Sequence, residues 1–431
     1  MCAMDSRDEN RQIEVRVTEF FVGSPDFNGV PLEVLAQQLG FGLAELRELL
    51  ADLVRQGRME LAFASHSDNP HIKRIQSLPI EEQLTGLAGN TDDVICVYPC
   101  AELVQSTVDV EERVRGRPYT KRLLLAEPQL TPVFFELSAL ERYFEDPRYS
   151  LEFHDRSGSI SVKSEHYEAG TLPKKDQTFL ETFGIAYDAS RRRVVAVFLR
   201  YLSDLSPEHQ QAWRLQEVAG PCNLNSDYAR AAIFGMWPEY YSVYEAFIQE
   251  QVEINKVAQV IGRPQIFRRT FEPGRPEHFQ PMLRPTRRNF HLFVETLDKM
   301  LSENIDVEFF GEDIELEERV RLGDGMIERQ RLGSLTVLER WLSRVYRTAD
   351  GEDVGKEVVG PLKEIRALRN KPAHALGVNE YDLGFPKEQD RLLGEARRSL
   401  TTLRLILSAH PNARGKYTAP EWLDSDKIVF Y

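Results

Sequence analysis

Residues 361–376 read PLKEIRALRNKPAHAL, an apolar helical pattern that ends in a cluster of polar and basic side chains. Leu362, Ile365 and Leu368 recur every three residues, a spacing that places them on one face of a helix. Pro361 suits the first turn of a helix, because the N–H that proline lacks would have no intrahelical partner there. The sequence therefore predicts a helix that begins at Pro361 and turns an apolar face inward.

Three neighbouring segments show the same helical period, at about 285–301, 334–346 and 387–409. Their apolar positions are Phe290, Phe293, Val294, Leu297, Met300 and Leu301 in the first, Leu335, Leu338, Trp341 and Leu342 in the second, and Leu392, Leu393, Ala396, Leu400, Leu403 and Leu407 in the third. One apolar face on each of four helices is typical of a helical bundle. We therefore expect an all-α four-helix bundle over residues 285–410, followed by a polar tail over 411–431.

The polar end of the helix that begins at Pro361 departs from what a bundle needs. Arg366, Asn370 and His374 follow one another at intervals of four residues, so a continuous helix would align them, with Arg369 on the flank. Pro372 would kink the helix and swing His374 toward the arginines. We expect these side chains to form one site.

An imidazole beside guanidinium groups suits the cleavage of a phosphodiester. His374 would take the proton of a ribose 2′-OH or give one to the leaving 5′-oxygen, since its ordinary pKa is close to neutral. Arg369 would stabilise the transition-state charge, Asn370 would orient the phosphate, and Arg366 and Lys371 would bind the substrate. Nearby cations should depress the pKa of His374. No acidic cluster stands beside the motif in the sequence, so neither a divalent metal nor another cofactor is expected.

The segment Arg369-Asn370-Lys371-Pro372-Ala373-His374 resembles the hallmark of the HEPN superfamily of helical ribonucleases: an arginine, usually a polar residue next, and a histidine after four to six intervening residues. The resemblance covers about residues 285–410. It implies His374 as catalytic acid and base, Arg369 as phosphate stabiliser and Asn370 as support. In that family two protomers usually pair to form one composite RNA cleft, often leaving a 2′,3′-cyclic phosphate, and many members are toxins or antiviral effectors.

A purely structural alternative exists for the same residues. Arg369 would then pair with an acidic residue such as Glu364 or Glu388, and His374 would cap the end of its helix. In that case the bundle would carry no catalytic site.

Residues 1–63 show the pattern of a winged helix-turn-helix. Pro31 opens one amphipathic helix, glycines at 40 and 42 supply a turn, a second helix runs to Gly57, and residues 59–63 alternate as a wing strand would. The second helix carries the acidic residues Glu45, Glu48 and Asp52 against the basic residues Arg47 and Arg55. Major-groove helices usually present more basic or amide side chains, so the module could contact either DNA or a protein.

The middle of the chain predicts less about function. Residues 64–130 resemble a linker with a mixed α/β segment, and residues 131–280 alternate strands and helices as a central α+β domain would. Residues 151–154 and 159–162 flank an Arg-Ser-Gly turn, which is typical of a hairpin. The histidines at 209, 278 and 291 lack metal-ligand spacing. The chain as a whole is therefore expected to be a multidomain α+β protein.

Composition limits the partners and the compartment. A net charge of −14 over 431 residues argues against a protein that coats nucleic acid, so an RNA substrate would have to meet a locally basic patch. Four cysteines, with Cys96 and Cys100 the closest pair, do not form a disulfide framework. No run of about 18 apolar residues is present, and the first residues are polar and acidic. We therefore expect a cytoplasmic protein that does not enter a membrane.

Three functional hypotheses follow. The first is a metal-independent endoribonuclease acting as a homodimer on RNA, serving as a toxin or an antiviral defence effector. The second is a regulator whose winged helix binds DNA or a protein and whose bundle is a catalytically silent dimerisation module. The third is a nucleotide-sensing effector, but Gly323-Asp324-Gly325 is too short for a phosphate-binding loop.

Overall fold

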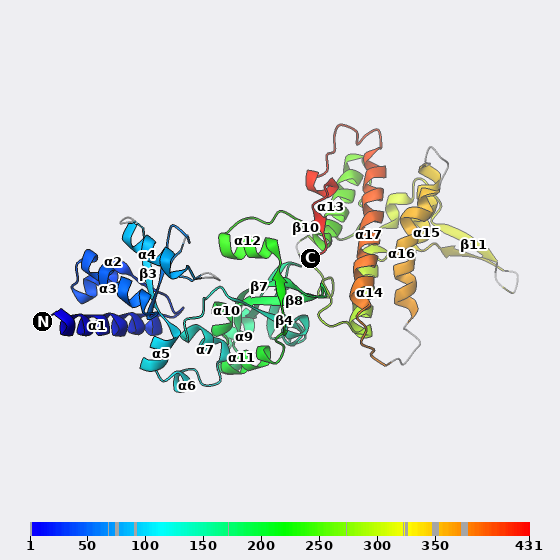
Figure 1. Cartoon of the computed structure of the whole chain (residues 1–431). Helices are drawn as coiled ribbons and strands as arrows, with labels where there is room; N and C mark the ends of the chain where they lie inside the picture. Colours follow the sequence, from blue (N-terminus) through cyan, green and yellow to red (C-terminus); the bar gives the residue numbers. More distant parts are fainter. Residues whose placement is uncertain are drawn as a thin grey trace. The chain divides into compact units, whose positions relative to one another are not determined.

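The computed structural model describes residues 2–67, 69–73, 77–89, 93–170, 172–272, 274–321, 323, 326–346, 353–371 and 378–431. The chain is an α+β protein that divides into two compact units, Met1–Met236 and Trp237–Tyr431 (Figure 1). The boundaries expected near residues 63, 130 and 280 stay predictions. Along the described parts of the chain, no helix is both long and apolar enough to cross a membrane.

The first unit begins with three helices and a three-stranded antiparallel sheet in the order β1-β3-β2. The elements are α1 (Cys2–Gly23), β1 (Val30–Pro31), α2 (Leu32–Leu39), α3 (Leu43–Arg55), β2 (Met59–Phe63) and β3 (Ile95–Pro99). Gly40 ends α2 at a φ of 75°, a left-handed conformation that glycine adopts without strain. Alternate residues of β2 are buried, as its sequence pattern predicts.

Short helices lie between β2 and the second sheet in the sequence. They are α4 (Ile80–Gly89), which lies between β2 and β3 in the chain, and then α5 (Ala101–Thr107), α6 (Val110–Arg113) and α7 (Pro118–Leu124). The second sheet is antiparallel, in the order β4-β8-β7-β6-β5, with β9 paired to β7. Its strands are β4 (Pro132–Glu136), β5 (Tyr149–Phe153), β6 (Ser157–Val162), β7 (Phe179–Asp188), β8 (Arg193–Phe198) and β9 (Cys222–Leu224).

The hairpin predicted around residues 151–162 is confirmed, because β5 pairs with β6. The helices of this region are α8 (Glu141–Phe144), α9 (Ser164–Glu168), α10 (Leu199–Ser203), α11 (Pro207–Arg214) and α12 (Ser226–Phe234), with 3-10 turns at Leu137–Leu140 and Lys174–Asp176. Ser206 begins α11 as its sequence suggests, since its side chain accepts from the backbone N–H of His209.

In the described residues of the second unit, five helices share one apolar core. They are α13 (Val243–Val260), α14 (Arg287–Leu301), α15 (Ser334–Val345), α16 (Val354–Asn370) and α17 (Phe385–Ser408). The apolar positions predicted from the helical period in α14, α15 and α17 are buried there. The first and last described strands of this unit pair with each other: β13 (Ile428–Val429) lies beside β10 (Tyr241–Ser242), which directly precedes α13.

Helix α13 packs with α17. One expectation about these helices is wrong. Pro361 does not begin α16: the helix starts at Val354, where Asp353 accepts from the N–H of Gly355, and Pro361 lies inside it. Proline has no N–H to donate to the carbonyl of Glu357, a residue on the exposed side of the helix.

A hairpin of β11 (Glu317–Arg321) and β12 (Ile327–Arg331) projects from the second unit beside α15 (Figure 1). The sequence did not predict these two strands. Among the described residues of this unit, 3-10 turns lie at Val307–Phe310, before the hairpin, and at Glu421–Asp424, in the tail.

Candidate functional site

Two arginines of α16 converge on one aspartate of α14. Arg369 Nη1 donates to Asp298 Oδ2 at 2.7 Å and also contacts Glu303 Oε1. Arg366 Nη2 donates to the hydroxyl of Ser302 at 2.7 Å, and its Nε lies 3.6 Å from Asp298 Oδ1. The two helices thus hold both guanidinium groups of the sequence motif in one polar cluster.

The carboxylate of Asp298 is completely buried, although it lies on an amphipathic helix between apolar neighbours. A buried charge is tolerated only when it is paired and hydrogen-bonded. Here the hydroxyl of Ser302 donates to the carboxylate, and Arg369 and Arg366 supply the positive charge. Asp298 therefore fixes where both arginines lie.

The partners of Arg369 among the described residues occupy only part of its guanidinium. Hydrogen bonds to Asp298 and then to Glu303 raise the pKa of its guanidinium, so the group stays charged. Both bonds use Nη1, and among the described residues Nε and Nη2 have no partner. The side chain is 28% exposed. Among the described residues, Asp298 and Glu303 therefore hold the guanidinium through Nη1 alone.

The cluster corrects one expectation. Acidic side chains do stand beside the motif, and they were missed because Asp298 of α14 and Glu303, just after that helix, lie 71 and 66 positions away in the sequence. The expected lowering of the pKa of His374 stays a prediction, because His374 lies outside the described residues. Across the ranges that the structure describes, no group of three or more potential ligands has metal-binding geometry.

The remaining motif residues lie at or beyond the end of α16. Asn370 and Lys371 are exposed. Pro372 and His374 lie outside the described residues, so the predicted kink and the approach of the imidazole to the arginines stay predictions.

The alternative without a catalytic site named Glu364 or Glu388 as the partner of Arg369, and neither pairs with it. Glu364 and Glu388 both pair with Arg391 of α17, each at 2.6 Å. Asp298 of α14 and Glu303, just after that helix, hold Arg369 instead. Arg369 is therefore ion-paired, as that alternative required, and Asp298 also contacts Arg366.

A polar stripe continues along α14 toward its N-terminus. Glu295 lies one turn before Asp298, and its pKa is lowered mainly by a hydrogen bond from Lys299, with a smaller contribution from Arg369. His291 lies one turn further, and partial burial lowers the pKa of its imidazole. Among the described residues, the Nδ1 atom of His291 is buried with no hydrogen-bond partner. Nothing in the spacing of the motif pointed to this histidine.

In the first unit, the second helix of the predicted winged helix presents an acidic surface. Glu45, Glu48 and Asp52 of α3 are exposed, whereas Arg47 donates to the carbonyl of Leu87 in α4 and Arg55 pairs with Asp52 at 2.8 Å. Both arginines considered for DNA binding thus have partners within the protein. A phosphate backbone would meet carboxylates on this face.

His209, Cys96 and Cys100 of the first unit are buried or half-buried. His209 is fully buried, with Nδ1 2.7 Å from both Tyr143 Oη and Thr178 Oγ1. Cys96 and Cys100 are free thiols, and burial raises the pKa of Cys96 to about 12 and that of Cys100 to about 11. Neither thiol has the depressed pKa of a reactive cysteine.

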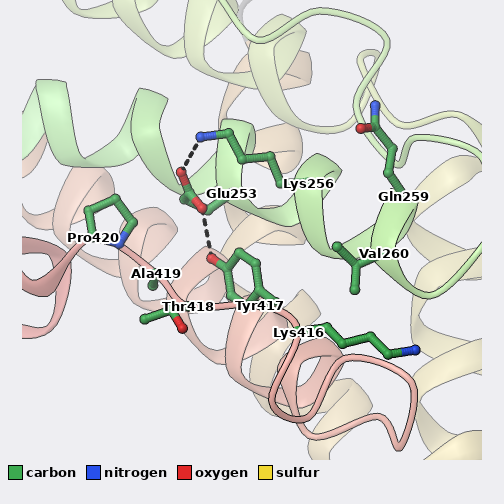
Figure 2. Close-up of a pocket in the computed structure, with 9 residues that line it drawn as sticks. All are labelled: Glu253, Lys256, Gln259, Val260, Lys416, Tyr417, Thr418, Ala419 and Pro420. Atoms are coloured by element: carbon green, nitrogen blue, oxygen red, sulfur yellow. Dashed lines mark hydrogen bonds and ion pairs between the residues drawn. The ribbon is translucent and has the colours of Figure 1, made fainter.

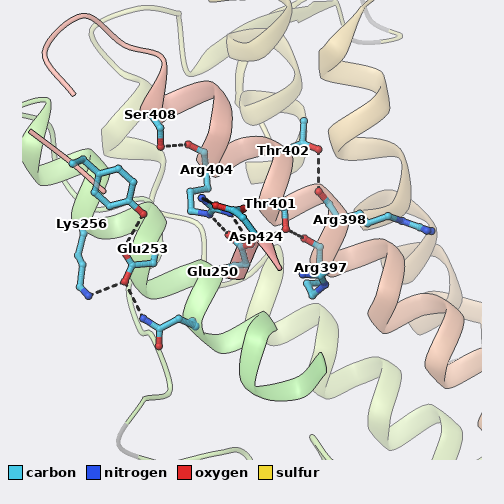
Figure 3. Close-up of polar contacts among 12 residues, drawn as sticks. Glu250, Glu253, Lys256, Arg397, Arg398, Thr401, Thr402, Arg404, Ser408 and Asp424 are labelled. Atoms are coloured by element: carbon cyan, nitrogen blue, oxygen red, sulfur yellow. Dashed lines mark hydrogen bonds and ion pairs between the residues drawn. The ribbon is translucent and has the colours of Figure 1, made fainter. Parts of the chain in front are cut away.

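A shallow pocket of about 650 Å³ lies between α13 and the tail (Figure 2). At its edge Glu253 accepts from Lys256 at 2.8 Å and from Tyr417 at 2.9 Å. Next to it, the buried Arg404 donates to Glu250 at 2.7 Å and also pairs with Asp424 (Figure 3). These contacts attach the tail to the helices, and the carboxylates are occupied by partners within the chain.

Comparisons with protein-family models, with curated proteins and with solved structures gave no match for this chain.

Proposed function

We propose that this chain is a metal-independent endoribonuclease, with Arg369 and His374 as catalytic residues and Asn370, Arg366 and Lys371 as support and substrate contacts. The observation that carries the proposal is the guanidinium of Arg369, which the buried Asp298 holds through Nη1 and whose Nε and Nη2 have no partner among the described residues. A prepositioned donor of this kind stabilises transition-state charge without reorganisation.

In the proposed reaction the ribose 2′-oxygen attacks the adjacent phosphorus, while an imidazole takes the 2′-OH proton. The bond from phosphorus to the 5′-oxygen breaks, and that oxygen receives a proton, leaving a 2′,3′-cyclic phosphate and a 5′-OH. Arg369 holds a non-bridging phosphate oxygen as the charge on it grows. Each motif offers one histidine for two proton transfers, so we propose a homodimer in which two motifs meet.

The resemblance to the HEPN superfamily supports this assignment, because Arg369 and Asn370, the first two residues of the motif, end a helix within a helical unit. By the same analogy we propose a role as a toxin or an antiviral effector. The order of elements in residues 2–63 and 95–99, with three helices and a β1-β3-β2 sheet, supports a winged helix in the first unit.

The test is incubation of the purified full chain with total tRNA and with a labelled single-stranded RNA in EDTA. We expect cleavage that leaves 2′,3′-cyclic phosphate ends, reduced by at least about 100-fold in His374→Ala, the usual scale for a lost general acid or base. Arg369→Ala should fall similarly. His410→Ala and Arg398→Ala, exposed residues of the same unit, serve as matched controls.

Unchanged cleavage in His374→Ala would remove the assignment of the motif. Absence of cleavage by the wild-type protein on every RNA would favour a second function, a regulator that acts through protein contacts. The acidic outer face of α3 is the observation behind that alternative. It predicts no salt-sensitive DNA binding, and a gel-shift assay comparing wild type with Arg47→Ala and Arg55→Ala would check this.

A further inference from the structure

The cluster around Arg369 cannot attract RNA strongly by itself. Asp298 and Glu303 offset Arg366 and Arg369, and the whole chain carries a net charge of −14. A polyanion approaching this site would be repelled at long range unless a basic surface lay near it. The β11–β12 hairpin is such a surface.

The hairpin has two faces of opposite charge. Residues that lie directly opposite each other in an antiparallel pair share a face, and so do alternate residues along a strand. The register therefore collects on one face Glu317, Arg319, Arg321, Ile327, Arg329 and Arg331. The other face carries Glu318, Val320, Glu328 and Gln330. We call the first set the arginine face.

The arginine face is open to solvent and poorly neutralised. All four of its arginines are exposed. Glu317 lies 3.8 Å from Arg329, too far for a hydrogen bond. Arg319, Arg321 and Arg331 have no ion pair to any of the described residues.

This arrangement works against the stability of the hairpin. Arg319 lies directly opposite Arg329, and like charges at such positions are destabilising. Neither face offers the row of apolar side chains that usually stabilises a two-stranded ribbon. A bound polyanion would relieve the repulsion, because each guanidinium donates two parallel hydrogen bonds to a phosphate.

The base of the hairpin adjoins the candidate site. Leu332 donates its N–H to the carbonyl of Leu316 at 2.9 Å and closes the two strands. Two residues further, the hydroxyl of Ser334 donates to the carbonyl of Ser302. Ser302 is also the residue whose hydroxyl accepts from Arg366. The arm is thus attached at the cluster that positions the catalytic arginine.

The opposite face is turned toward the helices at this base, because Glu318 pairs with Arg340 of α15. The arginine face consequently points away from that contact. The Cα atoms of successive arginines on one strand of such a ribbon are about 7 Å apart, and those of directly opposite residues are about 5 Å apart. A single strand of nucleic acid can therefore contact several of them at once.

We propose that the β11–β12 hairpin is an RNA-binding arm whose arginine face holds the backbone phosphates of the strand that enters the Arg369 site. The choice of RNA over another polyanion rests on the proposed function. The binding itself follows from the hairpin and does not require that the chain cleave anything.

The experiment measures binding without cleavage, by fluorescence anisotropy of a labelled single-stranded RNA with the full-length His374→Ala protein. The test variant adds Arg319→Gln and Arg329→Gln, the opposed pair. The matched control adds Arg398→Gln and Arg414→Gln, two exposed arginines of the same unit that lie outside the hairpin. Binding is followed between about 50 and 200 mM KCl.

We expect the test variant to bind roughly tenfold more weakly, equivalent to about 1.4 kcal/mol. The slope of log K against log salt should become shallower by about 1.4, at about 0.7 for each lost contact with a single strand. The control should keep both values. Removing two like charges relieves repulsion, so the thermal midpoint of the test variant should not fall, which separates lost binding from lost folding.

Equal affinity and equal salt slope in the test and control variants would overturn the inference, whether or not the wild type cleaves RNA. Sedimentation of each protein without RNA tests the other occupant, an acidic surface of a second copy. Loss of self-association in the test variant with unchanged RNA binding would assign the arginine face to a protein contact instead. Weakened RNA binding in a chain that cleaves no RNA would keep the arm and remove the ribonuclease.

Discussion

Replacement of Asp298 by asparagine tests the anchor of the candidate site most directly. The side chain keeps its size but loses the charge that faces Arg369 at 2.7 Å and Arg366 at 3.6 Å. A hydrogen bond to a charged group contributes roughly 1.5–3 kcal/mol. The two arginines are 28% and 34% exposed, so water recovers part of this on mutation. We expect a net loss of about 2 kcal/mol.

Calorimetry is the appropriate assay, because the two units can unfold in separate transitions. For a unit of this size 1 kcal/mol corresponds to roughly 2–4 °C, so the transition of the second unit should fall by about 4–8 °C. RNA cleavage should fall as well, since Arg369 loses the contact that orients it. Glu303→Gln is the matched control: this carboxylate is 43% exposed, and its loss should cost less than about 1 kcal/mol.

Equal shifts for Asp298→Asn and Glu303→Gln would refute the reasoning, because burial of Asp298 would then make no difference. A large thermal shift with unchanged cleavage would keep the anchor as a structural feature and remove its role in positioning Arg369.

Two further predictions concern buried ionisable groups. Glu250→Gln should cost roughly 3–5 kcal/mol, because it removes the buried partner of Arg404, whose side chain is 2% exposed; chemical denaturation would show this, and a loss below about 1 kcal/mol would contradict it. Burial lowers the pKa of His209 to about 4, against about 6.5 in an unfolded chain. The folded state thus favours the neutral ring, so stability of the first unit is complete above about pH 6.5 and is lost toward pH 4. Between about pH 7 and 5 the loss should be about 2 kcal/mol, and His209→Gln should flatten this dependence in calorimetry; an unchanged slope would assign it to another group.

The helices of the second unit were predictable because burial imposes a period on their sequences. The faces containing Leu297, Leu338 and Leu400 are buried where the period places them. The start of α16 was not predictable from Pro361. Proline favours the first turn of a helix but also occurs inside helices, at a cost in stability, and Pro361 lies inside α16. The apolar residues of α13 indicate that this helix packs against another element, but the sequence does not indicate which one.

The hairpin and the anchor were missed for different reasons. In β11 and β12 charged residues occupy both faces, so the alternation of apolar and polar residues that reveals a half-buried strand is absent. Asp298 did leave a signal, because a charged residue one turn after the buried Val294 requires a partner. Its partner could not be identified from the sequence, since pairing across 71 residues depends on how α14 and α16 pack.

The packing of α13 against α17 has a consequence for the order of folding during synthesis. Helix α13 packs against α17, which leaves the ribosome more than a hundred residues later, or roughly 10–30 s at typical rates of translation. The contacts within the first unit lie within residues 1–236, so that unit can fold while the second waits for its last elements. A nascent chain therefore carries a folded N-terminal half for many seconds before the cluster around Arg369 has a closed core beneath it.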